Sequence, residues 1–100
     1  MSEPLEYRAV RLCSGKGSYE VLPLHPVRLQ LEKLRDGLTG SGRAVVDVRV
    51  MLIVQGKPET TILEDGRVLI KTRKEEEARA EFERLLPLLR TAAQPGRSRR

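Results

Sequence analysis

An Asp-Gly pair between two short apolar runs is the feature that most constrains how this chain can fold. The runs are residues 60–63 and 68–71, with Asp65 and Gly66 between them. Asp-Gly in this position predicts a β-hairpin, because Gly accepts the positive φ that such a turn requires. Thr72 follows with Glu75 three residues later, a capping box that predicts a helix starting directly after the hairpin.

The segment after the hairpin has the pattern of an amphipathic helix. Three acidic residues, Glu75 to Glu77, lie where the positive end of the helix dipole is expected. The apolar stripe consists of Ala78, Phe82, Leu85, Leu86 and Leu89. Pro87 predicts a kink or an early end. From residue 92 the chain is small, polar and basic, which predicts a disordered tail over residues 92–100.

The first half of the chain predicts another hairpin and another helix. Residues 6–12 and 19–24 are extended runs joined by a Gly-containing turn. Residues 26–38 then carry an apolar stripe at helical spacing, with Pro26 suited to the first helical position. Glycines at positions 40 and 42 end this helix.

Residues 44–54 predict one long strand, because apolar side chains alternate along its whole length. Its even-numbered residues form one continuous apolar side, which we expect to face the helices. Val50→Asp is therefore expected to destabilise the fold by several kcal/mol. The expected core consists of Leu31, Leu34, Leu38, Val46, Val48, Val50, Leu52, Ile62, Ile70, Phe82 and Leu86.

Together these segments predict an α+β fold in the order β-β-α-β-β-β-α. Two helices would cover one face of an antiparallel sheet in a two-layer domain. A chain of 100 residues suits one such domain, over residues 1–91, followed by the tail.

Composition excludes several classes of protein. One Cys and one His cannot build a disulfide framework or a four-Cys metal site, and we expect neither a metal nor a cofactor. No apolar run approaches the roughly 20 residues of a membrane span. The N-terminus lacks a basic region followed by an apolar run, which favours a cytoplasmic protein. A charged fraction of 33% without any Asn is typical of thermophilic proteins, and also of Arg-rich chains from high-GC genomes.

The formal charge of +5 is concentrated at the C-terminus. Arg97, Arg99 and Arg100 contribute +3, so the body holds 16 basic and 14 acidic residues, a charge of +2. A basic tail of this kind could contact RNA or acidic proteins.

The order of short motifs along the chain resembles the small C-terminal accessory region of ThiF/MoeB/HesA-type adenylyltransferases, the ubiquitin-activating-like enzymes. The resemblance covers residues 12–86 and includes a Leu-Cys-Ser-Gly segment, a Leu-rich helix and an Asp-Gly-Arg turn. It ends in a helix containing Ala78-Arg79, Phe82 and Arg84. The turn has Leu-Glu where the family has Phe-Pro, and Phe82 and Leu85 replace tyrosines.

This resemblance implies a non-catalytic module associated with the activation of ubiquitin-like sulfur carriers. The chain has no Gly-rich nucleotide loop and no room for a nucleotide-binding domain, so adenylation by this chain alone is not expected. The implied partner is an adenylyltransferase or a sulfur-carrier protein. The alternative is a small basic RNA-associated protein.

The candidate binding residues are cations around the hairpin. Arg67, Lys71 and Arg79 could contact an acidic protein surface, while Asp65 and Gly66 form the turn. The competing interpretation is that these arginines make ordinary surface ion pairs, such as Arg79 with Glu75 at i, i+4.

Cys13 is a candidate thiol for sulfur relay, since Arg11 and Lys16 lie close in sequence and positive charge lowers a thiol pKa. An incidental Cys is the competing interpretation. An enzyme built on Cys13 is therefore a third hypothesis, after the binding module and the RNA-associated protein.

Overall fold

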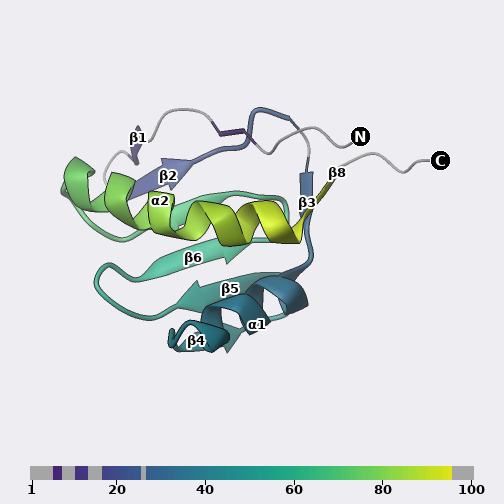
Figure 1. The fold of residues 1–100 in the computed structure, drawn as a ribbon. Helices are drawn as coiled ribbons and strands as arrows, with labels where there is room; N and C mark the ends of the chain where they lie inside the picture. The colour runs from purple at the N-terminus through teal and green to yellow at the C-terminus, as the bar shows by residue number, and fades with distance from the viewer. Residues whose placement is uncertain (1–5, 8–10, 14–16, 26, 96–100) are drawn as a thin grey trace.

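The computed structural model describes residues 6–7, 11–13, 17–25 and 27–95 and shows a two-layer α+β domain (Figure 1). A six-stranded antiparallel sheet forms one layer, and α1 (Leu31–Gly40) and α2 (Glu75–Ala92) form the other. The predicted fold class, an antiparallel sheet with two helices on one face, is confirmed.

The strand order across the sheet is β1-β2-β7-β6-β5-β4, with every neighbouring pair antiparallel. In chain order the six strands are β1 (Arg11–Cys13), β2 (Ser18–Val21), β4 (Val45–Asp47), β5 (Met51–Val54), β6 (Thr60–Leu63) and β7 (Val68–Ile70). Two further strands, β3 (Val27–Leu29) and β8 (Ala93–Pro95), pair separately at the side of the sheet.

Both predicted hairpins are present. β1 and β2 pair antiparallel, as do β6 and β7. At the second turn the Gly66 N–H donates to the carbonyl of Leu63 over 2.9 Å, and Gly66 has a φ of 98°. The positive φ that the Asp-Gly pair predicted is therefore observed.

The prediction of one strand over residues 44–54 is wrong, because the segment folds back on itself as the β4–β5 hairpin. The turn lies at Arg49, whose φ of 73° is positive. The Val48 N–H donates to the carbonyl of Met51 over 3.0 Å and closes the turn. Apolar and other residues continue to alternate through this turn, so the alternation alone does not indicate that the chain reverses here.

The fold-back also corrects the predicted core. Val46 pairs with Ile53 rather than sharing a side with Leu52, and it is 43% exposed. Val48 and Val50 at the turn are 45% and 56% exposed. These three valines are therefore not core residues, and the expected large effect of Val50→Asp loses its basis.

The first helix begins later than predicted. Residues 27–29 form β3, and α1 starts at Leu31, while Pro26 lies outside the described residues. The predicted stripe is otherwise correct, since Leu31, Leu34 and Leu38 are buried.

The start of α2 differs from the predicted capping box. Thr72 accepts a hydrogen bond from the Lys74 N–H over 3.1 Å and donates one to the Glu77 carboxylate over 2.7 Å. The helix then begins at Glu75, with Lys74 as its N-cap residue. Thr72 thus shapes the approach to the helix rather than capping it.

The end of α2 also differs from the prediction. The helix passes through Pro87 and ends at Ala92, so the proline does not shorten it. Ala93–Pro95 forms β8 on β3, and ordered structure extends past residue 91. Residues 96–100, with Arg97, Arg99 and Arg100, lie outside the described residues.

The core lies between the two helices and the sheet. Its fully buried members include Leu34, Leu52, Ile62, Ile70 and Leu89, while Leu86 is only partly buried. Neither described helix is long and apolar enough to cross a membrane.

Candidate functional site

Among the described residues, no helix lies on the side of the sheet that faces away from α1 and α2. Side chains alternate along each strand, so the residues between the buried ones all point to this side. We call this side the open face. Its members include Ser18, Glu20, Val46, Val48, Met51, Ile53, Glu59, Thr61, Leu63, Arg67, Leu69 and Lys71.

The open face has two parts of different chemistry. Val46, Val48, Met51, Ile53, Thr61 and Leu63 form the part at β4 to β6, which we call the hairpin patch. Glu20, Glu59, Arg67, Leu69 and Lys71 form the part around β7, which we call the β7 strip. The hairpin patch contains no charged residue, and the β7 strip contains two cations and two carboxylates.

The Asp65-Gly66-Arg67 turn at the end of the β7 strip is structurally constrained. Gly66 is buried, and a Cβ atom on it would lie 2.6 Å from Cγ1 of Val27 and 3.2 Å from Cγ of Pro23. Together with its positive φ, this makes glycine necessary here. Oδ1 of Asp65 accepts a hydrogen bond from the Arg67 N–H over 3.1 Å, which fixes the turn.

Arg67 remains available for further contacts. Its Nε lies 3.0 Å from Oδ2 of Asp65 in an exposed ion pair. Within the part of the chain that the structure describes, no contact engages its two terminal nitrogens. A guanidinium held at Nε alone can still present its remaining donors to a carboxylate.

Lys71 lies on the same side of β7 as Arg67, four residues further along. Its N–H donates to the carbonyl of Glu59 over 2.9 Å, which places Lys71 and Glu59 on neighbouring strands. Opposite charges in this arrangement stabilise a sheet by a few tenths of a kcal/mol. The structure therefore brings two of the three predicted cations to one face.

Arg79 lies in the other layer, on α2. It pairs with Glu75 over 2.7 Å at i, i+4 spacing, and both side chains are about half exposed. This is the ordinary helix-surface pair that the sequence offered as the competing interpretation. Arg79 does not share the open face with Arg67 and Lys71.

The other sequence candidates contribute no described side-chain contact. Cys13 ends β1 opposite Ser18, and its side chain lies outside what the structure describes. The three tail arginines, predicted to touch polyanions, also lie outside it. No group of three or more His, Cys, Asp or Glu side chains among the described residues could hold a metal ion.

Sequence reasoning missed a buried ion pair in the helical layer. Glu81 is 1% exposed, and its two carboxylate oxygens accept from Arg43 over 2.8 Å and from Arg84 over 2.7 Å. The sequence did indicate a buried position for Glu81, since it lies on the apolar side of α2 between Ala78 and Leu85. Full pairing makes this carboxylate a link between α2 and the loop that follows α1.

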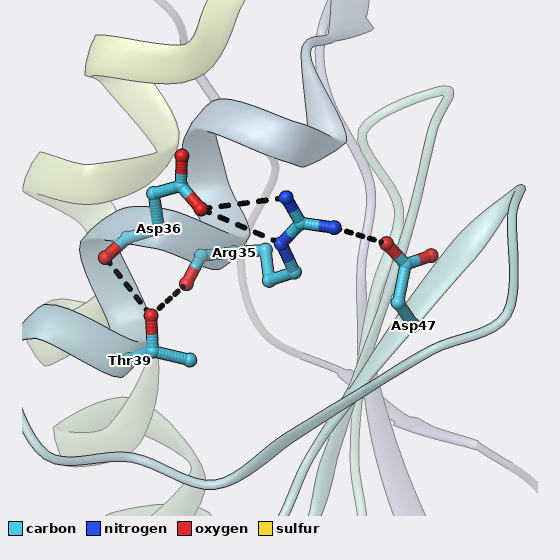
Figure 2. A network of polar contacts seen from close by, with 4 residues as sticks. All are labelled: Arg35, Asp36, Thr39 and Asp47. Carbon is cyan, nitrogen blue, oxygen red and sulfur yellow. Dashed lines mark hydrogen bonds and ion pairs between the residues drawn. The ribbon is translucent and has the colours of Figure 1, made fainter.

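A second polar network lies on the surface between α1 and β4 (Figure 2). Arg35 donates to Asp47 over 3.0 Å and to Asp36 over 3.4 Å. The hydrogen bond to Asp47, followed by the charge of Asp36, raises the pKa of the Arg35 guanidinium. Asp47 is thereby held on the helical side of the edge strand.

Tyr7 is a partly buried aromatic residue whose buried hydroxyl has no partner among the described residues. Its ring meets Phe82 edge-on, with ring centroids 4.9 Å apart. Burial, followed by the negative charge of Asp65, raises the pKa of the Tyr7 hydroxyl. The N-terminal segment therefore contributes to the core at Phe82.

An open hollow of about 500 Å³ lies beside the start of α1, lined in part by Arg28, Leu31, Lys33 and Glu64. Arg28 and Glu64 are paired across it at 3.2 Å. The hollow is open and is lined by side chains of both charges. It therefore does not indicate any particular class of ligand.

Comparisons with protein-family models, with curated proteins and with solved structures each found no match.

Proposed function

We propose that this chain is a non-catalytic protein-binding module that acts beside the activation of a ubiquitin-like sulfur carrier, with the open face as its binding surface. The observation that carries the proposal is the position of Arg67, whose terminal nitrogens make no hydrogen bond to the described residues, beside apolar residues of a sheet face on which the described chain places no helix. Apolar area surrounded by polar and charged residues is the usual anatomy of a protein interface.

The choice of partner rests on the sequence resemblance. The Asp-Gly-Arg turn and the helix after it resemble the accessory region of ThiF/MoeB/HesA-type enzymes, which suggests an adenylyltransferase or a sulfur carrier as partner. The fold is compatible with this, because Asp65 and Gly66 build the turn and leave Arg67 on the open face. A carboxylate on the partner could accept hydrogen bonds from the two terminal nitrogens of Arg67.

The test is a binding titration with the sulfur-carrier protein and the adenylyltransferase from the same organism. We expect Arg67→Glu to weaken binding at least about tenfold while changing stability by no more than about 0.5 kcal/mol. Binding should also weaken as salt rises from 50 to 500 mM, because an exposed charge contact is screened.

Arg79→Glu is the matched control. Arg79 and Arg67 have side chains 52% and 45% exposed, and each pairs with a nearby carboxylate. We expect Arg79→Glu to bind normally, since it lies in the helical layer. Loss of binding in Arg79→Glu but not Arg67→Glu would move the site to the helices. Binding of RNA with neither protein bound would favour the alternative of an RNA-associated protein, and loss of activity in Cys13→Ser alone would favour an enzyme.

A further inference from the structure

We propose that Tyr7 is a positioning residue for the turn at Gly66, and that it holds Arg67 in its place on the open face. This role rests on the proposed function, in which Arg67 contacts the partner, and it brings the N-terminal segment into that function. Three successive contacts lead from the core through Tyr7 to the turn.

One of these contacts joins the N-terminal segment to the loop that follows β2. Tyr7 forms an isolated antiparallel bridge with Pro23. Beside this bridge, the Leu24 N–H donates to the carbonyl of Glu6 over 2.9 Å. Pro23 has no N–H to contribute, so the Leu24 bond is the backbone hydrogen bond that the described residues provide here. The position of Pro23 therefore depends on the N-terminal segment.

The same loop packs directly on the turn. A Cβ atom on Gly66 would lie 3.2 Å from Cγ and 3.6 Å from Cβ of Pro23, and 2.6 Å from Cγ1 of Val27. Gly66 is buried although it lies in a hairpin turn, because these two side chains cover it. A displaced Pro23 would leave the turn without half of this cover.

Tyr7 is itself held against the core. Its ring packs edge-on against Phe82 of α2, with ring centroids 4.9 Å apart, and Phe82 is 9% exposed. Edge-to-face aromatic pairs contribute about 1 kcal/mol beyond the burial of their area. Phe82 thereby fixes Tyr7, and Tyr7 fixes the loop that packs on the turn.

Electrostatics provide a separate sign that Tyr7 lies close to the turn. The negative charge of Asp65 contributes, after burial, to the raised pKa of the Tyr7 hydroxyl. The two groups therefore lie near enough for their charges to interact. Asp65 is the residue whose Oδ1 accepts a hydrogen bond from the Arg67 N–H over 3.1 Å. Tyr7 thus approaches the turn at Asp65 as well as through Pro23.

The ring of Tyr7, and not its hydroxyl, has this role. The hydroxyl is buried and has no hydrogen-bond partner among the described residues. Phenylalanine at this position would keep the ring contact with Phe82, while alanine would remove it. Tyr7→Phe is therefore the conservative variant that should preserve the turn, and Tyr7→Ala is the disruptive one.

Amide hydrogen exchange on the full chain tests these contacts without any partner. The Leu24 N–H reports the bridge to the N-terminal segment, and the Gly66 N–H reports the hydrogen bond that closes the turn. The Lys71 N–H, bonded to the neighbouring strand at the far end of β7, is the reference. We expect Tyr7→Ala to speed exchange at Leu24 and Gly66 at least about tenfold relative to Lys71, because local opening becomes easier.

Two variants serve as controls for that measurement. We expect Tyr7→Phe to stay within about threefold of the wild type at the Leu24 and Gly66 amides. Val45→Ala should leave the ratio of Gly66 to Lys71 exchange unchanged, since Val45 is also partly buried against the core but lies on the edge strand β4. A denaturant midpoint shows that each variant is folded.

Unchanged exchange at Gly66 in a folded Tyr7→Ala variant would overturn the proposal, and so would equal acceleration in Tyr7→Phe. The wild-type chain gives a reading that needs no variant. Exchange at Leu24 and Gly66 should respond to added urea with the same slope, because one local opening exposes both amides. Different slopes would also overturn the proposal.

A double-mutant cycle tests whether Tyr7 acts on partner binding through Arg67. With the sulfur carrier or the adenylyltransferase, Tyr7→Ala should weaken binding at least about threefold in the wild-type chain, and hardly at all in an Arg67→Ala chain. A merely structural role for Tyr7 would give the same loss in both chains, which would overturn the proposal. If the wild-type chain binds neither protein, the proposed function fails, while amide exchange still tests the role of Tyr7 at the turn.

Discussion

The two faces of the sheet are made from the same strands and have different surroundings. Leu52 and Ile62 are fully buried beneath the helices, while their neighbours Ile53 and Leu63 point to the open face and are half buried. One residue along a strand therefore separates a core position from a candidate contact position. Hydrophobicity does not distinguish the faces, because Leu, Ile and Val occur on both.

What differs is the neighbouring layer. The covered face packs against α1 and α2, and the described part of the chain places no helix on the open face. Apolar residues on the covered face stabilise the fold, and we propose that those on the open face contact a partner. The predictions below test that division of roles.

The largest effect is expected on the covered face. Leu52→Ala should lower the free energy of unfolding by about 3 kcal/mol, because it leaves a cavity in the core. Ile53→Ala, one residue away on the open face, should cost about 1 kcal/mol. Urea denaturation of both variants measures the difference, and equal losses would show that the two faces are equally covered.

Arg43→Ala should destabilise the chain by about 2 kcal/mol, because it removes the more buried of the two arginines that pair with the buried carboxylate of Glu81. Arg35→Ala removes an exposed network and should cost less than Arg43→Ala, because exposed ion pairs contribute little to stability. Thermal unfolding of both variants gives the comparison. Arg35→Ala as the more damaging change would contradict the assignment of the buried pair as the stronger structural link.

Tyr7→Phe should be neutral or stabilising by up to about 1 kcal/mol at pH 7, since it removes a buried hydroxyl without a described partner. The pKa of Tyr7 is raised in the folded state above its ordinary value near 10. Above pH 10 the unfolded chain therefore releases a proton that the folded chain retains, and wild-type stability falls as pH rises.

This fall should be smaller in Tyr7→Phe, so the stability difference between variant and wild type should widen from pH 9 to pH 11. Urea midpoints across that range measure it. A constant difference would show that Tyr7 ionises as readily in the folded chain as in the unfolded one.

The smallest effect is expected at Val50. Its side chain is 56% exposed at the turn, so Val50→Asp should change stability by about 0.5 kcal/mol or less. A loss of several kcal/mol would instead support the single long strand that the alternation first suggested. The denaturant midpoint of this variant decides between the two.

Much of the fold could be predicted from the sequence, because several of its elements depend on residues close together in the chain. The hairpin at Asp65 and Gly66 and the stripe of Leu31, Leu34 and Leu38 are set by residues close together in the chain. The β4–β5 turn was missed because apolar alternation runs through it and Arg49 and its flanking valines are not typical turn residues. A local signal existed in Asp47, whose Oδ1 accepts a hydrogen bond from the Arg49 N–H over 2.9 Å, as in an Asx turn.

The candidate site could be predicted from the sequence only in part. The sequence identified Arg67 and Lys71, and alternation along β7 brings them to one side. It grouped Arg79 with them because a helix follows the hairpin directly, and only the packing of α2 shows that Arg79 belongs to the other layer. Glu81 was missed because a single carboxylate on an apolar stripe does not reveal its partner 38 residues away.

Thiol labelling tests the central claim, that one face of the sheet is covered and the other open, most directly. In a Cys13→Ser background, single cysteines would replace Leu52 and Ile70 on the covered face, and Ile53 and Leu69 on the open face. We predict that the open-face thiols react within about tenfold of an unfolded chain. The covered thiols should react at least about a hundredfold more slowly, because they become accessible only when the fold opens. Equal protection of all four thiols would contradict the account.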